Sequence, residues 1–164
     1  MTVLAALGAL VTLTLAAVIA GTFFAFSVSV LPGLGTLGAE PAVAAMRGMN
    51  AKILNPLFLT PFVAVPVTAA LTGVALLALG HRAAAVAFLA AALLYLLGAF
   101  LPTAVVNVPL NEALAGGAAD GPERAAALWA EFAPRWTRAN ALRTVAAVGT
   151  VALTGLGLLL WPRG

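Results

Sequence analysis

Four long apolar stretches dominate this chain and limit what it can fold into. A helix that spans a bilayer needs about 20 apolar residues, and the stretches at about 2–31, 53–79, 83–106 and 141–161 meet or approach that length. Only 8% of the 164 residues are charged, and the mean hydropathy is +1.12. A domain this small leaves much of its surface in water, so the composition excludes an ordinary soluble enzyme and a disordered chain. We expect an all-α fold, a four-helix transmembrane bundle that forms one integral membrane domain over residues 1–164.

Charge and cysteine content narrow the function classes. The net charge is +3, but no run of basic residues occurs, so no nucleic-acid partner is expected. The chain has no Cys, which excludes disulfides and thiolate metal sites. Residues 2–31 carry no charge and exceed the length of a signal-peptide core, so we expect a retained first span.

The distribution of Lys and Arg predicts the orientation. With four spans, both termini lie on one side and the long connections 32–52 and 107–143 on the other. The positive-inside rule then places these connections in the cytoplasm, for a multi-pass protein of a bacterial plasma membrane. The side with the long connections carries Arg47, Lys52, Arg124, Arg135, Arg138 and Arg143, and the other side carries Arg82 and Arg163.

Two prolines suggest how the second long connection is built. Pro122 precedes an i, i+3, i+4, i+7 apolar pattern, which predicts a short extra amphipathic helix between spans three and four. Pro109 disfavours helical geometry at the residue before it, so we expect the third span to stop or kink near Asn107. Asn107 and Asn111 then either cap broken helix ends or bind a polar ligand. Asn55, just before Pro56, has the same two interpretations at the start of span two.

Polar residues other than Ser and Thr gather at one membrane face. Such groups are costly at membrane depth and tend to face the bundle interior, where they pair or serve function. A pocket at this end is therefore the default site hypothesis. Trp136, Asn140 and Arg143 are spaced i, i+4 and i+7, so they share one face of the fourth helix. The alternatives are that Arg143 extends to the interface and that Trp136 anchors the helix there.

Other site chemistries find little support in the residues. His81 is the sole His and lies in a short turn, so a His-based metal or haem site is not expected. No Asp or Glu pair has metal-ligand spacing, and we expect no bound metal. Glu112 and Glu131 are the carboxylates considered as general bases, each with a surface charge as the alternative.

Four sequence blocks carry a resemblance: GTFFAFSV at 21–28, MNAKILNPLF at 49–58, NVPLN at 107–111 and WTRANALRT at 136–144. These blocks resemble signature segments of the anthrone oxygenase family, a group of small four-span membrane proteins. The resemblance runs in order along nearly the whole chain. Members often carry an aromatic residue and a His where this chain has Ala139 and Ala141.

The resemblance implies a membrane oxidoreductase that oxidises a flat phenolic, polyketide-type substrate with O₂ as co-substrate and no other cofactor. Under this hypothesis the catalytic residues are Arg143, Asn140, Asn107 and Glu112. Arg143 binds an oxyanion, and Glu112 or a water takes the proton. The candidate substrate-binding residues are Asn50, Asn55, Asn111, Trp136, Phe23, Phe24 and Phe26.

Two other hypotheses stay open at this stage. The polar cluster is either the site of a non-enzymatic small-molecule or lipid-binding protein, or a structural network that terminates broken helices. A pocket that contains Arg143 and at least two Asn side chains favours a ligand site over the structural network. Expected partners are membrane lipid and a small apolar aromatic substrate, with a homo-oligomer as a further candidate.

Overall fold

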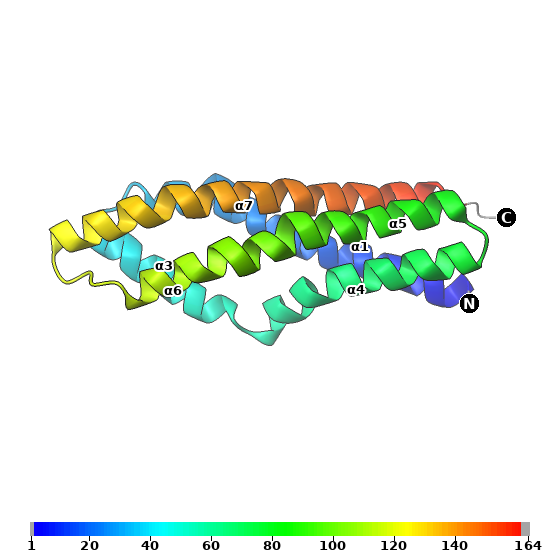
Figure 1. Cartoon of the computed structure of the whole chain (residues 1–164), viewed down its shortest axis with the longest axis horizontal. Coiled ribbons are helices and arrows are strands. Elements are labelled where there is room, and N and C mark those ends of the chain that lie inside the picture. Colours follow the sequence, from blue (N-terminus) through cyan, green and yellow to red (C-terminus); the bar gives the residue numbers. More distant parts are fainter. Residues whose placement is uncertain (1, 162–164) are drawn as a thin grey trace.

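The computed structural model describes residues 2–161, and within this range the chain is helical and contains no strand (Figure 1). Four continuous helical stretches are long and apolar enough to cross a membrane. Large apolar side chains are exposed along all four, as expected for faces that meet lipid. Arg163, counted in the orientation argument, lies outside the described residues. The four stretches are Thr2–Leu34, Pro56–Ala78, Arg82–Gly116 and Pro122–Leu159.

The first and third stretches are each built from several helical elements. The first consists of α1 (Thr2–Ala25), the π-helical turn η1 (Phe26–Val30) and α2 (Leu31–Leu34). The third consists of α5 (Arg82–Tyr95), the π-helical turns η2 (Leu96–Phe100) and η3 (Thr103–Asn107), and α6 (Val108–Gly116). The remaining helices are α3 (Ala39–Ile53), α4 (Pro56–Ala78) and α7 (Pro122–Leu159).

The bundle has two different ends (Figure 1). The start of α1, the α4–α5 turn and the end of α7 lie at one end. The α4–α5 turn is made by Gly80, whose φ of 83° suits glycine. At the other end, α3, α6 and the first part of α7 extend beyond α4. The site described below forms where α3, α6 and the first part of α7 adjoin the rest of the bundle.

Prolines explain the three π-helical turns. In each case the residue before a proline donates its backbone N–H to the carbonyl five residues back: Leu31 to Phe26, Leu101 to Leu96, and Val108 to Thr103. A proline ring in an α-helix clashes with the carbonyl four residues back and removes that carbonyl's hydrogen bond. A turn widened by one residue relieves the clash, and such turns are frequent at functional sites.

A further proline leaves a carbonyl that a side chain satisfies. Pro66 lies inside α4 and cannot donate to the carbonyl of Phe62. The buried hydroxyl of Tyr95 donates to that carbonyl at 3.1 Å. In lipid no water is present to satisfy such a group, so this hydrogen bond ties α4 to α5.

Small residues let the helices approach closely beside the site. A Cβ built on Gly98 would lie 2.5 Å from the Cβ of Ala146, so η2 and α7 are in direct contact there. Close approach at small residues is the usual way that helices associate in membranes. This contact fixes α7 one turn from Arg143.

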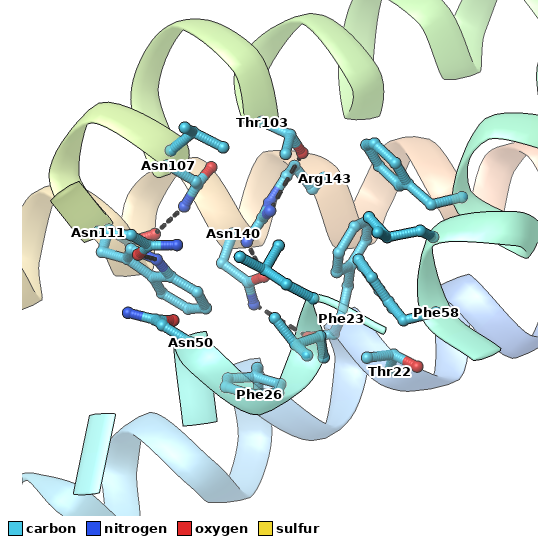
Figure 2. Close-up of a pocket in the computed structure, with 16 residues that line it drawn as sticks. Thr22, Phe23, Phe26, Asn50, Phe58, Thr103, Asn107, Asn111, Asn140 and Arg143 are labelled. Carbon is cyan, nitrogen blue, oxygen red and sulfur yellow. Dashed lines mark hydrogen bonds between the residues drawn. The ribbon is translucent and has the colours of Figure 1, made fainter. Parts of the chain in front are cut away.

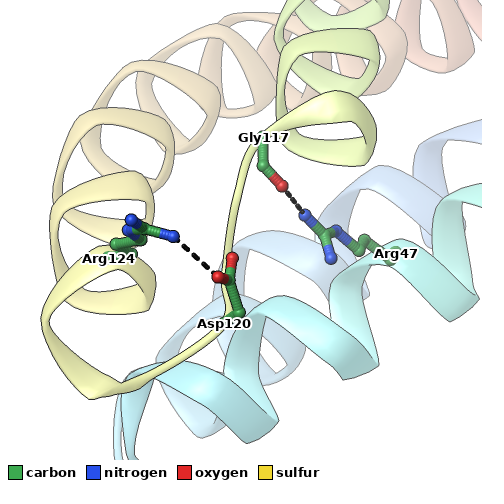
Figure 3. A network of polar contacts seen from close by, with 4 residues as sticks. All are labelled: Arg47, Gly117, Asp120 and Arg124. Atoms are coloured by element: carbon green, nitrogen blue, oxygen red, sulfur yellow. Dashed lines mark hydrogen bonds and ion pairs between the residues drawn. The ribbon is translucent and has the colours of Figure 1, made fainter.

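Arg47 joins the helices at the far end (Figure 3). Its Nε donates to the carbonyl of Leu114 at 2.9 Å and its Nη2 to that of Gly117 at 2.6 Å. These carbonyls lie at the C-terminal end of α6, where cations and donors are favourable. Arg47 therefore holds α3 against α6. On the same side, Asp120 and Arg124 form an exposed ion pair.

Two expectations about the second long connection need correction. The amphipathic stretch after Pro122 is helical, but it is continuous with the fourth span in the 38-residue α7 rather than a separate short helix. The third span does not stop near Asn107, because the π-helical turn η3 carries the helix past Pro109 into α6. Asn107 makes no helix-capping hydrogen bond.

The predicted cap at Asn55 is confirmed, since its Oδ1 accepts from the backbone N–H groups of Leu57 and Phe58.

Candidate functional site

A pocket of about 170 Å³ lies where α3 and α6 meet the membrane-spanning bundle (Figure 2). Its walls are largely apolar, with a few polar groups that converge from different helices, which is the usual character of a small-molecule site. Elements far apart in the sequence contribute to it, from α1 to α7. The lining residues are Thr22, Phe23, Phe26, Asn50, Ile53, Leu54, Phe58, Leu59, Phe62, Thr103, Asn107, Val108, Asn111, Trp136, Asn140 and Arg143.

Arg143 is the cation of this pocket. Its side chain comes from α7 and is only 5% exposed. Nη1 donates to Oγ1 of Thr103 at 3.1 Å, and Nη2 donates to Oδ1 of Asn140 at 2.8 Å. The guanidinium carbon lies 4.4 Å from the ring centroid of Phe23 and 5.1 Å from that of Trp136. Ring faces attract cations most strongly when both are shielded from water.

No carboxylate neutralises Arg143. All five Asp and Glu residues of the chain are exposed, and none lines the pocket. The two ion pairs among residues 2–161 are Arg124–Asp120 and Arg135–Glu131, both at the surface. A buried charge is costly unless it is paired, and here neutral oxygens and aromatic rings supply the whole compensation. The pocket is therefore built to attract an anion.

Asn140 is held in one orientation by a network between α7 and the first helix. Its Nδ2 donates to the carbonyl of Phe23 at 2.9 Å and to Oγ of Ser27 at 2.8 Å. Ser27 Oγ lies 3.0 Å from Oγ1 of Thr144, which donates to the backbone carbonyl of Asn140. With both amide hydrogens oriented toward α1 and η1, the amide oxygen faces Arg143.

Three buried polar atoms at the pocket have no hydrogen-bond partner among the described residues: Nδ2 of Asn50, Oδ1 of Asn107 and Nε of Arg143. All three residues line the pocket. Nine in ten or more of such buried groups are ordinarily satisfied. The pocket thus presents two free donors and one free acceptor, which suits a ligand with oxygen atoms or hydroxyl groups.

Aromatic rings form the rest of the pocket. Phe26 and Trp136 lie with ring centroids 5.6 Å apart, while Phe58 and Phe62 stack at 5.6 Å. Trp136 is fixed by its indole N–H, which donates to Oδ1 of Asn111 at 2.9 Å. The arrangement offers ring faces and edges to a flat aromatic ligand.

Most of the predicted site residues meet in this pocket, and three do not. Arg143, Asn140, Asn107, Asn50, Asn111, Trp136, Phe23 and Phe26 line it. Phe24 is 53% exposed, because the helical rotation that turns Phe23 inward turns its neighbour outward. Glu112 is exposed on α6 next to Asn111, and Asn55 is occupied as a helix cap. The structure therefore places these three residues outside the pocket.

Several lining residues were not predicted. Phe58 lies in one of the resembling sequence blocks and follows the Asn55 cap by one helical turn, so that block contained a signal for it. Thr103 precedes Asn107 by four residues, but the widened turn at η3 makes the shared face hard to infer. Phe62 and Leu54 are apolar residues without any distinguishing pattern.

No group of three or more His, Cys, Asp or Glu gathers anywhere in residues 2–161. The polar side-chain groups that line the pocket are amides, hydroxyls, one indole N–H and one guanidinium. These are donors and neutral acceptors suited to an organic oxyanion or phenol rather than to the ligand set of a transition metal.

Fold and pocket together define a class: a small helical membrane protein of four spans with a largely apolar pocket that contains one buried cation. The model of the family described as anthrone oxygenase matches residues 55–153, more than half of the chain. The chain belongs to the anthrone oxygenase family. Asn107, Asn111, Trp136, Asn140 and Arg143 all fall inside the matched range. No curated protein and no solved structure matches the chain.

Proposed function

We propose that this protein oxidises a flat phenolic substrate of the anthrone type with O₂ and that the reaction takes place in the pocket around Arg143. The family supports a related oxygenase function. The observation that carries the proposal is the buried guanidinium of Arg143, which has no carboxylate partner among residues 2–161 and lies against the rings of Phe23 and Trp136. An anthrone becomes an electron-rich anion before it reacts with O₂, and such a site stabilises that anion.

The proposed reaction balances without a further reductant. The ring CH₂ opposite the carbonyl loses one proton, and the carbonyl oxygen takes up the resulting negative charge as an enolate. The enolate passes electrons to O₂, and a carbon–oxygen bond forms at the former CH₂. Loss of water then leaves a second carbonyl, so one O₂ supplies the new ketone oxygen and the oxygen of one water. The substrate itself is the electron donor.

Arg143 is the proposed oxyanion-binding residue, because it carries the charge of the pocket lining and its Nε donor has no partner among the described residues. Asn140 and Thr103 orient the guanidinium. The unpaired Nδ2 of Asn50 and the unpaired Oδ1 of Asn107 are proposed to bind the substrate's oxygen and hydroxyl groups. A dry, preorganised donor set of this kind stabilises a developing negative charge more strongly than water does.

Water is the proposed proton acceptor. Glu112 is exposed and outside the pocket, and no described lining residue is a carboxylate or a histidine. Ala141, where related proteins often carry His, is exposed on the outer face of α7. A base at that position would therefore not reach a ligand beside Arg143. Stabilisation of the enolate by Arg143 makes the proton easier for water to remove.

The remaining proposals concern location and cofactors. We place the protein in the bacterial plasma membrane as a multi-pass protein, with α3, α6 and the first part of α7 in the cytoplasm, because most Lys and Arg lie on that side. Oxygen is the proposed co-substrate and no other cofactor takes part. Metal and flavin analysis of active, purified protein tests this point directly.

The test of the proposed function is O₂ uptake and quinone formation by purified protein with a simple anthrone. We expect Arg143→Gln to lose at least 100-fold in kcat/KM, in the range found when oxyanion-binding groups are removed. Arg124→Gln is the matched control, since it removes an exposed arginine of the same helix. A thermal melt of each variant shows whether the protein is still folded. Arg143→Lys keeps the positive charge at this position, so it should retain more activity than Arg143→Gln. Unchanged turnover in folded Arg143→Gln would refute the proposal.

A second candidate function is a non-enzymatic carrier of an anionic aromatic molecule. The described lining residues include no carboxylate or histidine that could act as a general base, and this favours the carrier. Such a carrier binds the anthrone anion or the quinone tightly and consumes no O₂ above the rate of the free substrate. The same O₂-uptake assay, combined with a binding titration, separates the two functions.

A further inference from the structure

We propose that a second groove, on the outer side of η3 and α7, binds one anionic phospholipid. The groove has a volume of about 480 Å³ and lies between the third helical stretch and α7. Its lining is apolar except for Arg135 and Arg138, which precede Ala139 and Leu142 along α7 and so lie toward one end of the groove. The proposal does not depend on any step of the oxidation.

The apolar part of the groove suits an acyl chain. Leu101, Val105 and Leu142 line it and are 48%, 59% and 53% exposed. No other described helix covers them. In the bilayer such side chains are in contact with lipid tails, and a depression among them holds a tail in place through van der Waals packing.

The charged end of the groove suits a phosphate. Arg138 is exposed and has no ion-pair or hydrogen-bond partner among residues 2–161. Arg135 lies 3.5 Å from Glu131, but both side chains are more than half exposed, so this pair is weak. The groove therefore has a net positive charge, and an arginine pair binds phosphate oxygens well.

Depth in the membrane supports a lipid in particular. The predicted fourth span begins near residue 141, and a rise of about 1.5 Å per residue places Arg138 roughly 4.5 Å outside the hydrocarbon. Headgroup phosphates occupy this layer, which extends several ångströms beyond the hydrocarbon core. A lipid whose phosphate contacts Arg138 has its tail beside Leu142 and Val105.

The groove shares a wall with the ligand pocket. Val105 and Val106 of η3 line the groove, while Thr103 and Asn107 of the same turn line the pocket. A bound acyl chain supports this π-helical turn from the outside. We therefore expect the lipid to stabilise the protein as well as to bind it.

The test uses the full chain in mild detergent, with phosphatidylglycerol and phosphatidylcholine of identical acyl chains as probes. Native mass spectrometry counts the retained lipid, and a thermal melt gives Tm. We expect phosphatidylglycerol to bind preferentially and to raise Tm. Arg138→Gln should weaken phosphatidylglycerol binding about fivefold, the usual contribution of one basic residue near a membrane surface. Val105→Trp fills the groove without altering charge and should lower the retention of phosphatidylglycerol as well.

Arg124→Gln is the charge-matched control, because Arg124 is exposed on the same helix but far from the groove. It should bind phosphatidylglycerol as the parent protein does. Equal losses in Arg124→Gln and Arg138→Gln would show diffuse attraction and overturn the proposal. Equal retention of the two lipids, or a rise in Tm with inorganic phosphate alone, would overturn it too.

Discussion

Replacing Thr103 with Asp should abolish most of the affinity of the pocket for an anionic ligand. The Asp variant should be at least as stable as the corresponding Asn variant. Thr103 Oγ1 accepts a hydrogen bond from Arg143 Nη1 at 3.1 Å. A carboxylate at this position supplies the counterion that the buried guanidinium lacks. Thr103→Asn is the matched control, since it has the shape of Asp without the charge.

The expected size follows from the geometry. Two opposite charges about 4 Å apart attract by roughly 4 kcal/mol at an effective dielectric constant of about 20. A carboxylate on residue 103, at about 6 Å from the ligand oxyanion, repels it by roughly 3 kcal/mol under the same conditions. We therefore expect Thr103→Asp to bind the ligand about 100-fold more weakly than Thr103→Asn does. Its Tm should equal or exceed that of Thr103→Asn, because a paired buried cation costs less than an unpaired one.

The assay is a titration of detergent-solubilised protein with an anionic hydroxyanthraquinone, followed by quenching of tryptophan fluorescence. Trp136 lies in the pocket wall and reports on occupancy. The quantities compared are Kd and Tm of the two variants. Equal affinities would refute the reasoning, because the charge of Arg143 would then not be what holds the ligand. A lower Tm for Thr103→Asp would show that Arg143 is already compensated.

Three further predictions concern packing and hydrogen bonds. Asn140→Leu removes the acceptor of Arg143 Nη2 and two donated hydrogen bonds, and should lower the free energy of unfolding by roughly 2 kcal/mol, measured by denaturant titration in detergent. Gly98→Leu should cost about 1–3 kcal/mol in the same measurement, because its Cβ would lie 2.5 Å from the Cβ of Ala146. Gly21→Leu should be neutral, because a Cβ there would have no neighbour within 4 Å outside its own helix backbone and adjacent residues. Phe23→Ala should weaken ligand binding about tenfold through the lost ring face, and Phe24→Ala should leave Kd unchanged, since Phe24 is outside the pocket. Each prediction has an outcome that would contradict the structure. For Asn140→Leu it is a smaller drop in the free energy of unfolding than an exposed substitution causes. For the glycine pair it is an equal drop in the two variants, and for the Phe pair it is an equal Kd.

The sequence predicts the part of the site that depends on regular helical spacing. Trp136, Asn140 and Arg143 share one face of a continuous α-helix, and all three line the pocket. The Asn55 cap followed the same local rules. The four spans follow from the length of the apolar stretches.

The third helical stretch shows why the rest escaped prediction. Pro109 indicates a disturbed helix, but not whether the chain breaks or widens by one residue, because packing against α7 decides between them. The widened turn leaves Asn107 in the pocket and the exposed Glu112 outside it. Of the two proton acceptors considered from the sequence, Glu112 or a water, the structure places Glu112 outside the pocket. Phe23 and Phe24 differ by one residue, and composition alone does not say which of them faces inward.

The ionisation of a bound phenol tests the central claim most directly. A planar phenol whose anion absorbs at a longer wavelength is titrated with pH, free and bound to the protein. The account predicts that the bound phenol ionises about two pH units lower than the free one, as a group does beside an opposite charge. In Arg143→Gln this difference should disappear, and in Arg124→Gln it should persist. A bound phenol that ionises at the same pH as the free one, or at a higher pH, would contradict the assignment of Arg143 as the oxyanion-binding group.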